Sequence, residues 1–331
     1  MTPNCRRSLW SLSSIEAATD CDSNLPFEIP GAVVLSAPSL PVLQEAANEL
    51  YHQINSDPSC TNQYIIVLSI SQPLQELIGG YRNPLEAPYR LTLDEKHQRA
   101  VIRIIPSKAH ERVTQSFSNE VVEKLLDMGI RSRDYTMNAA SRYHGAVCDK
   151  EADQSLTPSS NPSDDDDWPS LVIETGLSES EAQPRNDAHW WFSNSGYQVN
   201  LTLLIYIQRS PQRRVVLKLY SFRPTTARIT RGLQVEPGRT LLDGPASSQA
   251  VPPTQLRPHL AAREIVVTSS NVENAPLELE FESVVRRQPA PNTEEKNITF
   301  TSHDRGSCIV LPPCLSGIVS IVIMIATFVS T

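Results

Sequence analysis

The amino-acid sequence predicts a mixed fold of the α/β (α+β) class with irregular ends. Two long segments have apolar residues at helical spacing, and short β-branched runs lie between and after them. The chain has 331 residues, of which 40% are hydrophobic and 20% charged, as in globular proteins. A sizeable core is therefore expected.

The first half of the chain contains the clearest periodic segments. Residues 39–54 have the i, i+3, i+4 spacing of an amphipathic helix, and the short β-branched run at 63–70 is typical of a buried strand. Two alternating runs within 89–105 flank a charged turn, which predicts a hairpin. Residues 110–130 predict the clearest helix, with Gly129 as its C-terminal cap. Its buried face is expected to carry Val113, Phe117, Val121, Leu125 and Met128.

The second half predicts strands, one helix and a long hairpin. Short extended pieces are expected near Tyr135 and at 143–152, followed by a polar loop whose four adjacent aspartates are typical of a solvated segment rather than a calcium site. A strand is expected at 170–176 and a helix ending at Gly196. Residues 197–222 predict a hairpin that turns at 210–212.

Composition sets the expected domain boundaries. Residues 1–26 are a polar lead, 27–224 a folded domain, and 225–305 a Pro-rich extension. Within this extension, the runs REIVVTSS and PLELEFESVV are expected to return as edge strands. Residues 306–331 form a hydrophobic C-terminal tail.

Charge and cysteine usage limit the classes of partner and the compartment. A net charge of -8 argues against a dedicated nucleic-acid binder, although a basic cleft can exist on an acidic protein. Six cysteines without a C-x-x-C motif or a Cys/His cluster predict neither a zinc site nor a dense disulfide framework. The first twenty residues lack a sustained apolar stretch, so no signal peptide is expected. An intracellular location follows.

The C-terminal tail has two competing interpretations. No charged residue follows Arg305, and the unbroken part from Cys314 onwards would make a helix of about 27 Å against a hydrocarbon core of ~30 Å. A C-terminal membrane anchor is one hypothesis. A buried element, or a mistaken end of the gene model, carries equal weight. Asn297 in the sequence NIT is a glycosylation acceptor only if that region enters the secretory lumen.

Two carboxylates are candidates for a metal site. Asp153 ends one predicted extended segment and Glu174 lies within the next strong strand, with a long polar loop between them that allows the strands to pair. Mg²⁺ is commonly held by one or two carboxylates together with phosphates and water. Such an ion would stabilise charge on a phosphate and activate a water molecule. The alternative is that Glu174 faces solvent or pairs with Arg185 or Lys218.

A family resemblance supports the metal-site interpretation. The succession KEADQSLTP, WPSLVIETGLSES and RNDAHWWFSNSGYQVNLTLLIYI resembles uncharacterised fungal proteins related to the Uma2 family of restriction-endonuclease-like proteins, within the PD-(D/E)xK superfamily. It covers roughly residues 90–224, within the predicted domain. The resemblance implies a restriction-endonuclease-like core, with a small mixed sheet flanked by helices.

The resemblance also implies roles for individual residues. Asp153 matches the aspartate of the PD step, with Ala152 where proline is common, and Glu174 matches the acid of the (D/E)xK step. Glu120 matches the helix acid of many members. The motif lysine is absent, because Thr175 and Gly176 follow Glu174.

A second lysine common in the family is also missing. Asp187 fits the aspartate that often precedes it, but Trp191 stands where that lysine would be. The candidate substitutes are Lys150, Arg185 and Lys218. Loss of a positioned cation from such a site would cost about 3 to 4 kcal/mol of transition-state stabilisation.

Two functions of different classes follow. The favoured one is a degenerate nuclease-like fold that acts as a binding or scaffold protein, with membrane contact through its tail. The alternative is a Mg²⁺-dependent nuclease with Asp153 and Glu174 as metal ligands, Glu120 assisting, and Lys150 or Lys218 replacing the lysine. Other conspicuous residues receive structural interpretations: helix-to-sheet packing for Trp190 and Trp191, a helix cap or an indole contact for Asp187, and no special role for His110, His144 and His189.

Overall fold

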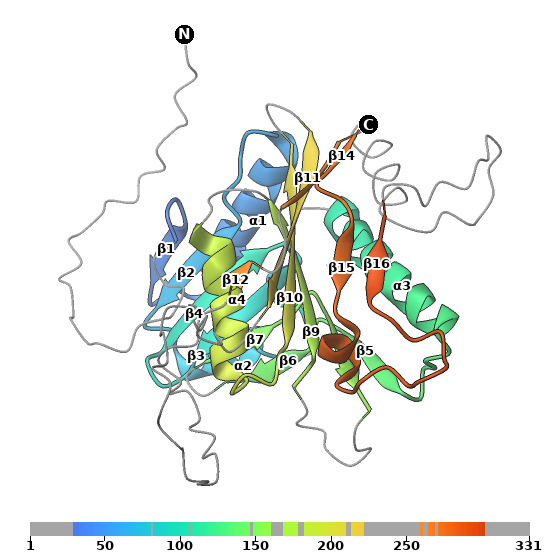
Figure 1. Ribbon diagram of the computed structural model, residues 1–331. Coiled ribbons are helices and arrows are strands. Elements are labelled where there is room, and N and C mark those ends of the chain that lie inside the picture. Colours follow the sequence, from blue (N-terminus) through green and yellow to red (C-terminus); the bar gives the residue numbers. More distant parts are fainter. Residues whose placement is uncertain are drawn as a thin grey trace, which may run out of the picture.

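The computed structural model shows a mixed α+β fold (Figure 1). Two large sheets and a separate strand pair are present, where the sequence predicted one small mixed sheet. The structure describes residues 29–80, 82–105, 108–145, 148–159, 168–177, 182–209, 213–221, 259–260, 264–268 and 271–301.

The first sheet has six strands, and helices α1 (Leu40–Ser56) and α2 (Gln72–Ile78) pack against it. Both α1 and the hairpin of β3 and β4 confirm the sequence predictions. The first pair is parallel and the others are antiparallel. The strand order is β1 (Val33–Ser36), β2 (Tyr64–Leu68), β4 (Arg99–Ile104), β3 (Tyr89–Asp94), β7 (Asp149–Glu151) and β6 (Arg142–His144).

Alternation along β4 gives the two faces of this sheet different chemistry. Ala100, Ile102 and Ile104 belong to the apolar cluster that contains the buried residues of α1 and α2. Because successive strand residues point to opposite faces, Val101 and Arg103 point away from these helices. The sheet thus buries one apolar face and turns an arginine towards the second sheet.

The second sheet has eight strands and is mixed. Strands β9 and β10 are parallel, while the other pairs are antiparallel. The predicted long hairpin is confirmed as β10 and β11; its turn at 210–212 lies outside the described residues. The order is β14 (Val272–Glu273), β13 (Ile265–Val267), β11 (Arg214–Ser221), β10 (Leu201–Gln208), β9 (Leu171–Leu177), β8 (Gln154–Pro158) and β5 (Tyr135–Ala139), with β12 (His259–Leu260) pairing with β11.

Helices α3 (Lys108–Asp127) and α4 (Ala182–Asn194) pack against opposite faces of β9. Leu171 and Ile173 of β9 join the cluster of α3, whereas Val172 joins the cluster of α4. The five apolar residues predicted for the inner face of α3 are all buried, and Gly129 has the positive φ of a C-terminal cap, +86°. Trp190 and Trp191 pack in the core, as predicted.

The region after 264 completes the core of α3. Strands β15 (Leu277–Leu279) and β16 (Ile298–Phe300) pair with each other beside α3 (Figure 1). Phe300 stacks on Phe117 of α3. The run REIVVTSS forms β13, but β13 lies between β11 and β14, so the prediction of an edge strand is wrong for this run. The run PLELEFESVV forms β15 and then a short helix, α5 (Phe281–Val285), rather than one strand, because Phe281 and Val284 share a buried face at helical spacing.

Several predictions concern residues outside the described part. These are the polar lead, the four aspartates at 164–167, most of the Pro-rich extension and the hydrophobic tail at 306–331. Within the residues that the structure describes, no helix is both long enough and apolar enough to cross a bilayer.

A buried charge cluster as the candidate functional site

Pairing of β8 with β9 brings the two predicted acids together. Asp153 directly precedes β8, and Gln154 pairs with Ile173, so Asp153 lies beside Glu174 in the middle of β9. Both side chains are almost fully buried, with 1% and 2% exposure respectively. The two acids therefore meet as predicted, but through a different strand. The extended segment predicted at 143–152 forms β6 and β7 of the first sheet, and the strand beside β9 is β8, which lies within the predicted polar loop.

Arg103 of the first sheet bridges the two carboxylates. Its Nη2 atom lies 2.8 Å from Asp153 Oδ2 and 2.8 Å from Glu174 Oε2. Its Nη1 atom donates to the carbonyl oxygen of Thr175 at 3.3 Å. Arg103 itself is 8% exposed. A single guanidinium therefore lies between the two acids and also links the two sheets.

Asp153 has further neighbours at both of its carboxylate oxygens. Arg90 Nε lies 3.1 Å from Asp153 Oδ1, and the backbone N–H of Thr175 donates to Oδ2 at 2.8 Å. Burial raises the pKa of Asp153, but the charges of Arg103 and Arg90 and the hydrogen bond from the Thr175 N–H outweigh burial and hold that pKa below its usual value of 3.8. Asp153 is therefore a carboxylate at neutral pH.

His110 of α3 adjoins this group in a defined tautomer. Its Nε2 atom lies 2.6 Å from the carbonyl oxygen of Thr175 and 3.5 Å from Asp153 Oδ2. Burial, with the Arg103 and Arg90 charges, outweighs Asp153 and lowers the pKa of His110, so the ring is neutral. Because a carbonyl oxygen only accepts, Nε2 carries the proton and Nδ1 is an acceptor. Nδ1 is buried without a partner among the described residues.

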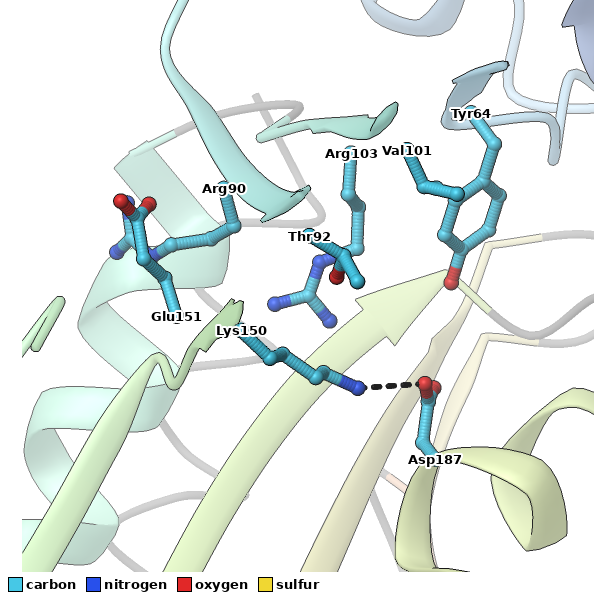
Figure 2. A pocket seen from close by; sticks show the side chains of 8 residues that line it. All are labelled: Tyr64, Arg90, Thr92, Val101, Arg103, Lys150, Glu151 and Asp187. Carbon is cyan, nitrogen blue, oxygen red and sulfur yellow. Dashed lines mark hydrogen bonds and ion pairs between the residues drawn. The ribbon is translucent and has the colours of Figure 1, made fainter. Parts of the chain in front are cut away.

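Glu174 is contacted from α4 and β7. Trp191 Nε1 donates to Glu174 Oε1 at 3.0 Å, and Lys150 Nζ lies 3.6 Å from the same oxygen. Lys150 also bonds Asp187 at 2.7 Å, which Figure 2 shows as a dashed line. Burial raises the pKa of Glu174, and the opposing charges of Arg103 and Lys150 offset only part of that rise.

Charges in this cluster balance. Each carboxylate faces a cation, and no charge among these described groups is left over. Compensation of this kind is what burial of ionised groups requires. The cations are Arg90, Arg103, Lys150 and Arg142, and the carboxylates are Asp153, Glu174, Asp187 and Glu151.

Two cavities adjoin the cluster. The smaller, drawn in Figure 2, has a volume of about 20 Å³, enough for one water molecule. It is lined by Tyr64, Arg90, Thr92, Val101, Arg103, Lys150, Glu151 and Asp187. The larger, about 470 Å³, lies between the start of α3 and strands β3, β5 and β8. Its lining residues are Arg90, His110, Glu111, Arg112, Thr114, Gln115, Ala139, Asp153 and Gln154.

The arrangement does not fit a Mg²⁺ ion. Mg²⁺ requires oxygen ligands at about 2.0–2.1 Å in an octahedron, usually with several water molecules. Here the position between the two acids is taken by Arg103 Nη2. In the described part of the chain, no group of three His, Cys, Asp or Glu side chains is placed to hold a metal ion.

Of the other predicted site residues, Lys150 lies at the acid pair, and Lys218 and Glu120 have no described contact with it. Lys150 Nζ lies 3.6 Å from Glu174 Oε1. Lys218 of β11 instead pairs at 2.5 Å with Glu264, which directly precedes the neighbouring strand β13. Glu120 is buried on α3 at 5% exposure, and the contacts described for the acid pair do not include it. The side chain of Arg185 lies outside the described part of the structure.

Several partners of the acids were not predicted. The stated alternative to a metal site had Glu174 facing solvent or pairing with Arg185 or Lys218, but Glu174 pairs with Arg103 and Lys150. Asp187 pairs with Lys150 instead of contacting an indole. His110, predicted to have no special role, lies at the acid pair. One signal was available, because Arg103 interrupts the apolar run VIRII. An arginine is rarely buried in a strand unless its charge is paired with an acid.

Comparison with known proteins gives only distant likenesses of structure. No protein-family model and no curated protein matches this chain. The solved structures that match include one described as a "putative nuclease belonging to DUF820" from Anabaena variabilis ATCC 29413. The two chains are 13% identical, the match covers 40% of this chain and 71% of that chain, and the TM-score is 0.30.

Proposed function

We propose that this protein is a non-catalytic binding or scaffold protein with a restriction-endonuclease-like core, whose acid pair serves as a structural ion cluster. The observation that carries the proposal is the Arg103 bridge between Asp153 and Glu174, with both acid side chains at most 2% exposed. Metal-dependent phosphodiester hydrolysis by this pair would require that a metal ion, a water molecule and a phosphate all reach the acids. In this arrangement the acids contact protein donors instead.

The position of the missing motif lysine supports the same proposal. A Cβ atom added to Gly176 would lie 3.3 Å from Gln63 Oε1, and that oxygen accepts the backbone N–H of Leu177 at 2.7 Å. A side chain at 176 would therefore require Gln63 Oε1, the acceptor of this buried hydrogen bond, to shift by a few tenths of an ångström.

Within the described part of the chain, the larger cavity is the candidate place for a bound partner. Its volume of about 470 Å³ falls within the roughly 300–1,000 Å³ of small-molecule sites. Cationic and acidic side chains both line it, so it offers no uniformly basic track for nucleic acid. Membrane contact would involve residues 306–331 and is a separate part of the proposal.

A metal-dependent nuclease is the second candidate, and Lys150 is the observation in its favour. Lys150 Nζ lies 3.6 Å from Glu174 Oε1, so a lysine from another position does reach the acid pair. Asp153 and Glu174 would hold Mg²⁺ and Lys150 would replace the motif lysine. This function requires that Arg103 leave its place between the acids.

Cleavage and metal-binding assays on the full chain separate the two functions. Labelled single- and double-stranded DNA and RNA would be incubated with Mg²⁺ or Mn²⁺, and Mn²⁺ binding would be measured by calorimetry. We expect no cleavage above that of Asp153→Asn/Glu174→Gln, a control that keeps the side-chain shapes, and no difference in Mn²⁺ heat. Cleavage or Mn²⁺ binding that disappears in the control would overturn the non-catalytic proposal.

A further inference from the structure

We infer that the larger cavity binds a small neutral molecule through a primary carboxamide group, which Arg90, His110 and Asp153 recognise together. The inference rests on the proposed function, because it names the kind of ligand that this non-catalytic binding protein would hold. It involves no metal ion and no covalent step.

Three buried polar atoms of residues that line this cavity have no hydrogen-bond partner among the described residues. They are Arg90 Nε, His110 Nδ1 and Asp153 Oδ1. The side chains of His110 and Asp153 are each only 1% exposed, so bulk water does not replace the missing partners. Proteins rarely leave buried donors and acceptors unpaired, because an unpaired buried polar group is costly. A molecule bound in the cavity would supply the missing hydrogen bonds.

Arg90 and Asp153 present a donor and an acceptor side by side. Arg90 Nε lies 3.1 Å from Asp153 Oδ1, yet the two atoms make no hydrogen bond with each other. A primary carboxamide has a carbonyl oxygen that accepts and an NH₂ group that donates twice. Its oxygen would accept from Arg90 Nε, while one of its N–H groups would donate to Asp153 Oδ1.

His110 supplies the second acceptor. Its Nε2 atom donates to the Thr175 carbonyl oxygen at 2.6 Å and lies 3.5 Å from Asp153 Oδ2, so the ring lies next to the same carboxylate. Burial lowers the pKa of His110 and keeps the ring neutral, which leaves Nδ1 as an acceptor. Nδ1 would accept the second N–H of the carboxamide. The group therefore matches all three unpartnered atoms, which are two acceptors and one donor.

The charges around the cavity favour a neutral ligand. Its lining includes two cations and two acids, which are Arg90, Arg112, Glu111 and Asp153. A charged ligand would add an uncompensated charge beside the buried carboxylate, and burial of such a charge is costly. The cavity volume of about 470 Å³ is far larger than the roughly 30 Å³ of one water molecule. It therefore has room for a ring attached to the carboxamide.

The experiment measures binding of benzamide to the full-length protein by saturation-transfer NMR and calorimetry, beside three analogues of similar shape. Benzoate is an anion without donors, benzamidine is a cation without an acceptor, and N,N-dimethylbenzamide has no N–H group. We expect one benzamide to bind per chain, about tenfold more tightly than any analogue, because each analogue loses hydrogen bonds. No benzamide binding, or an analogue that binds as tightly as benzamide, would overturn the inference.

Two substitutions on β5 test whether benzamide occupies this cavity. Ala139 lines the cavity and is exposed, so Ala139→Phe should fill the cavity without loss of the fold, which circular dichroism checks. Thr136 is also exposed but points to the opposite face of the strand, so Thr136→Phe is the matched control. We expect Ala139→Phe to abolish benzamide binding and Thr136→Phe to retain it. Equal binding by the two variants would contradict the inference.

Arg90 and His110 provide two further measurements. Arg90→Lys keeps a cation beside Asp153 but removes the Nε donor, and it should weaken benzamide binding about fivefold. In protein with ¹⁵N-labelled histidine, benzamide should shift the Nδ1 resonance of His110, which is identified by its absence from His110→Gln. A resonance that benzamide leaves unchanged would show that Nδ1 is not a contact.

Failure of this inference is distinguishable from failure of the proposed function. Absence of benzamide binding would leave the Arg103 bridge between the two acids, and with it the non-catalytic proposal, intact. Metal-dependent cleavage that is lost in Asp153→Asn/Glu174→Gln would overturn the proposed function whether or not benzamide binds.

Discussion

Glu174 is contacted by three donor side chains of the charge cluster. It is buried in the middle of β9. Arg103 contacts its Oε2 atom, and Trp191 and Lys150 contact its Oε1 atom. An ionised carboxylate without such partners would be too costly to bury. Each donor therefore contributes to stability by an amount that depends on the charge of its acceptor.

The two adjacent tryptophans of α4 allow a matched test of that dependence. Trp191 Nε1 donates to the Glu174 carboxylate at 3.0 Å, whereas Trp190 Nε1 donates to the thiol of Cys148 at 2.9 Å. Trp191→Phe changes the packing and also removes the hydrogen bond to Glu174. We expect the lost hydrogen bond alone to lower the free energy of unfolding by about 1.5–3 kcal/mol, because its acceptor is a charged group. Trp190→Phe should cost less, since a sulfur is a weak acceptor. Urea unfolding of both variants measures the difference, and equal losses would contradict an ionised Glu174.

Sequence alone could predict the acid pair but not its partners. Asp153 and Glu174 stand next to predicted strands on either side of one loop, and that local pattern is enough to suggest that they meet. Arg103 comes from another sheet, 50 residues from Asp153 in sequence. No local periodicity specifies how two sheets pack. The arginine within VIRII indicates only that a buried partner exists, and does not identify it.

At the level of elements, alternation along β3 and β4 has two consequences. One set of side chains packs against α1 and α2, and the other set, including Arg90 and Arg103, points towards β9. Arg90 and Arg103 are directly opposite each other in the register of the hairpin. Like charges in that position are destabilising unless acids lie between or beside them. Asp153 supplies that compensation.

Elements with strong periodicity could be predicted, and weakly patterned ones could not. Helices α1 and α3 and the hairpins at 89–104 and 201–221 have long, regular patterns. The segment at 277–285 contains both alternating and helical spacings, and its contacts with the core decide that it becomes β15 followed by α5. Short ambiguous segments of this kind depend on tertiary packing.

Strand β16 provides a test of how firmly the late segment belongs to the core. Phe300 is fully buried and stacks on Phe117 of α3 with 4.8 Å between ring centroids. We expect Phe300→Ala to lower the free energy of unfolding by about 3–5 kcal/mol, because it leaves a cavity beside α3. Thr299→Ala, on the more exposed face of the same strand, should change it by less than about 0.5 kcal/mol. Similar effects of the two substitutions on chemical unfolding would show that the segment is detached from the core.

For the molecule as a whole, the charge cluster lies where the two sheets meet. Arg103 of the first sheet contacts Glu174 and Thr175 of β9, and Gln63, just before β2, accepts the backbone N–H of Leu177 in the same strand. His110 of α3 also contacts Thr175. Global unfolding separates these groups and exposes all of them to water. Stability should consequently depend on pH through the groups whose pKa differs between the folded and unfolded chain.

His110 gives this dependence a definite sign. Burial lowers its pKa in the folded protein below the ordinary value of 6.5, so as the pH falls below 6.5 the unfolded chain binds a proton that the folded chain does not. The free energy of unfolding should then fall, by up to about 1.4 kcal/mol per pH unit, until the lowered pKa is reached. Glu174 acts in the opposite direction, because its raised pKa makes the folded chain bind the extra proton above pH 4.5. A single wild-type profile would therefore mix the two effects.

Comparison with His110→Gln isolates the histidine contribution. A glutamine amide can donate to the Thr175 carbonyl as Nε2 does, but it does not titrate. We expect the stability advantage of the wild-type protein over this variant to shrink as the pH is lowered from about 7 to about 5.5, measured by urea unfolding at each pH. Parallel profiles would mean that His110 is equally protonated in both states. That result would contradict the neutral Nε2–H tautomer and the cationic surroundings, Arg90 and Arg103, that keep it uncharged.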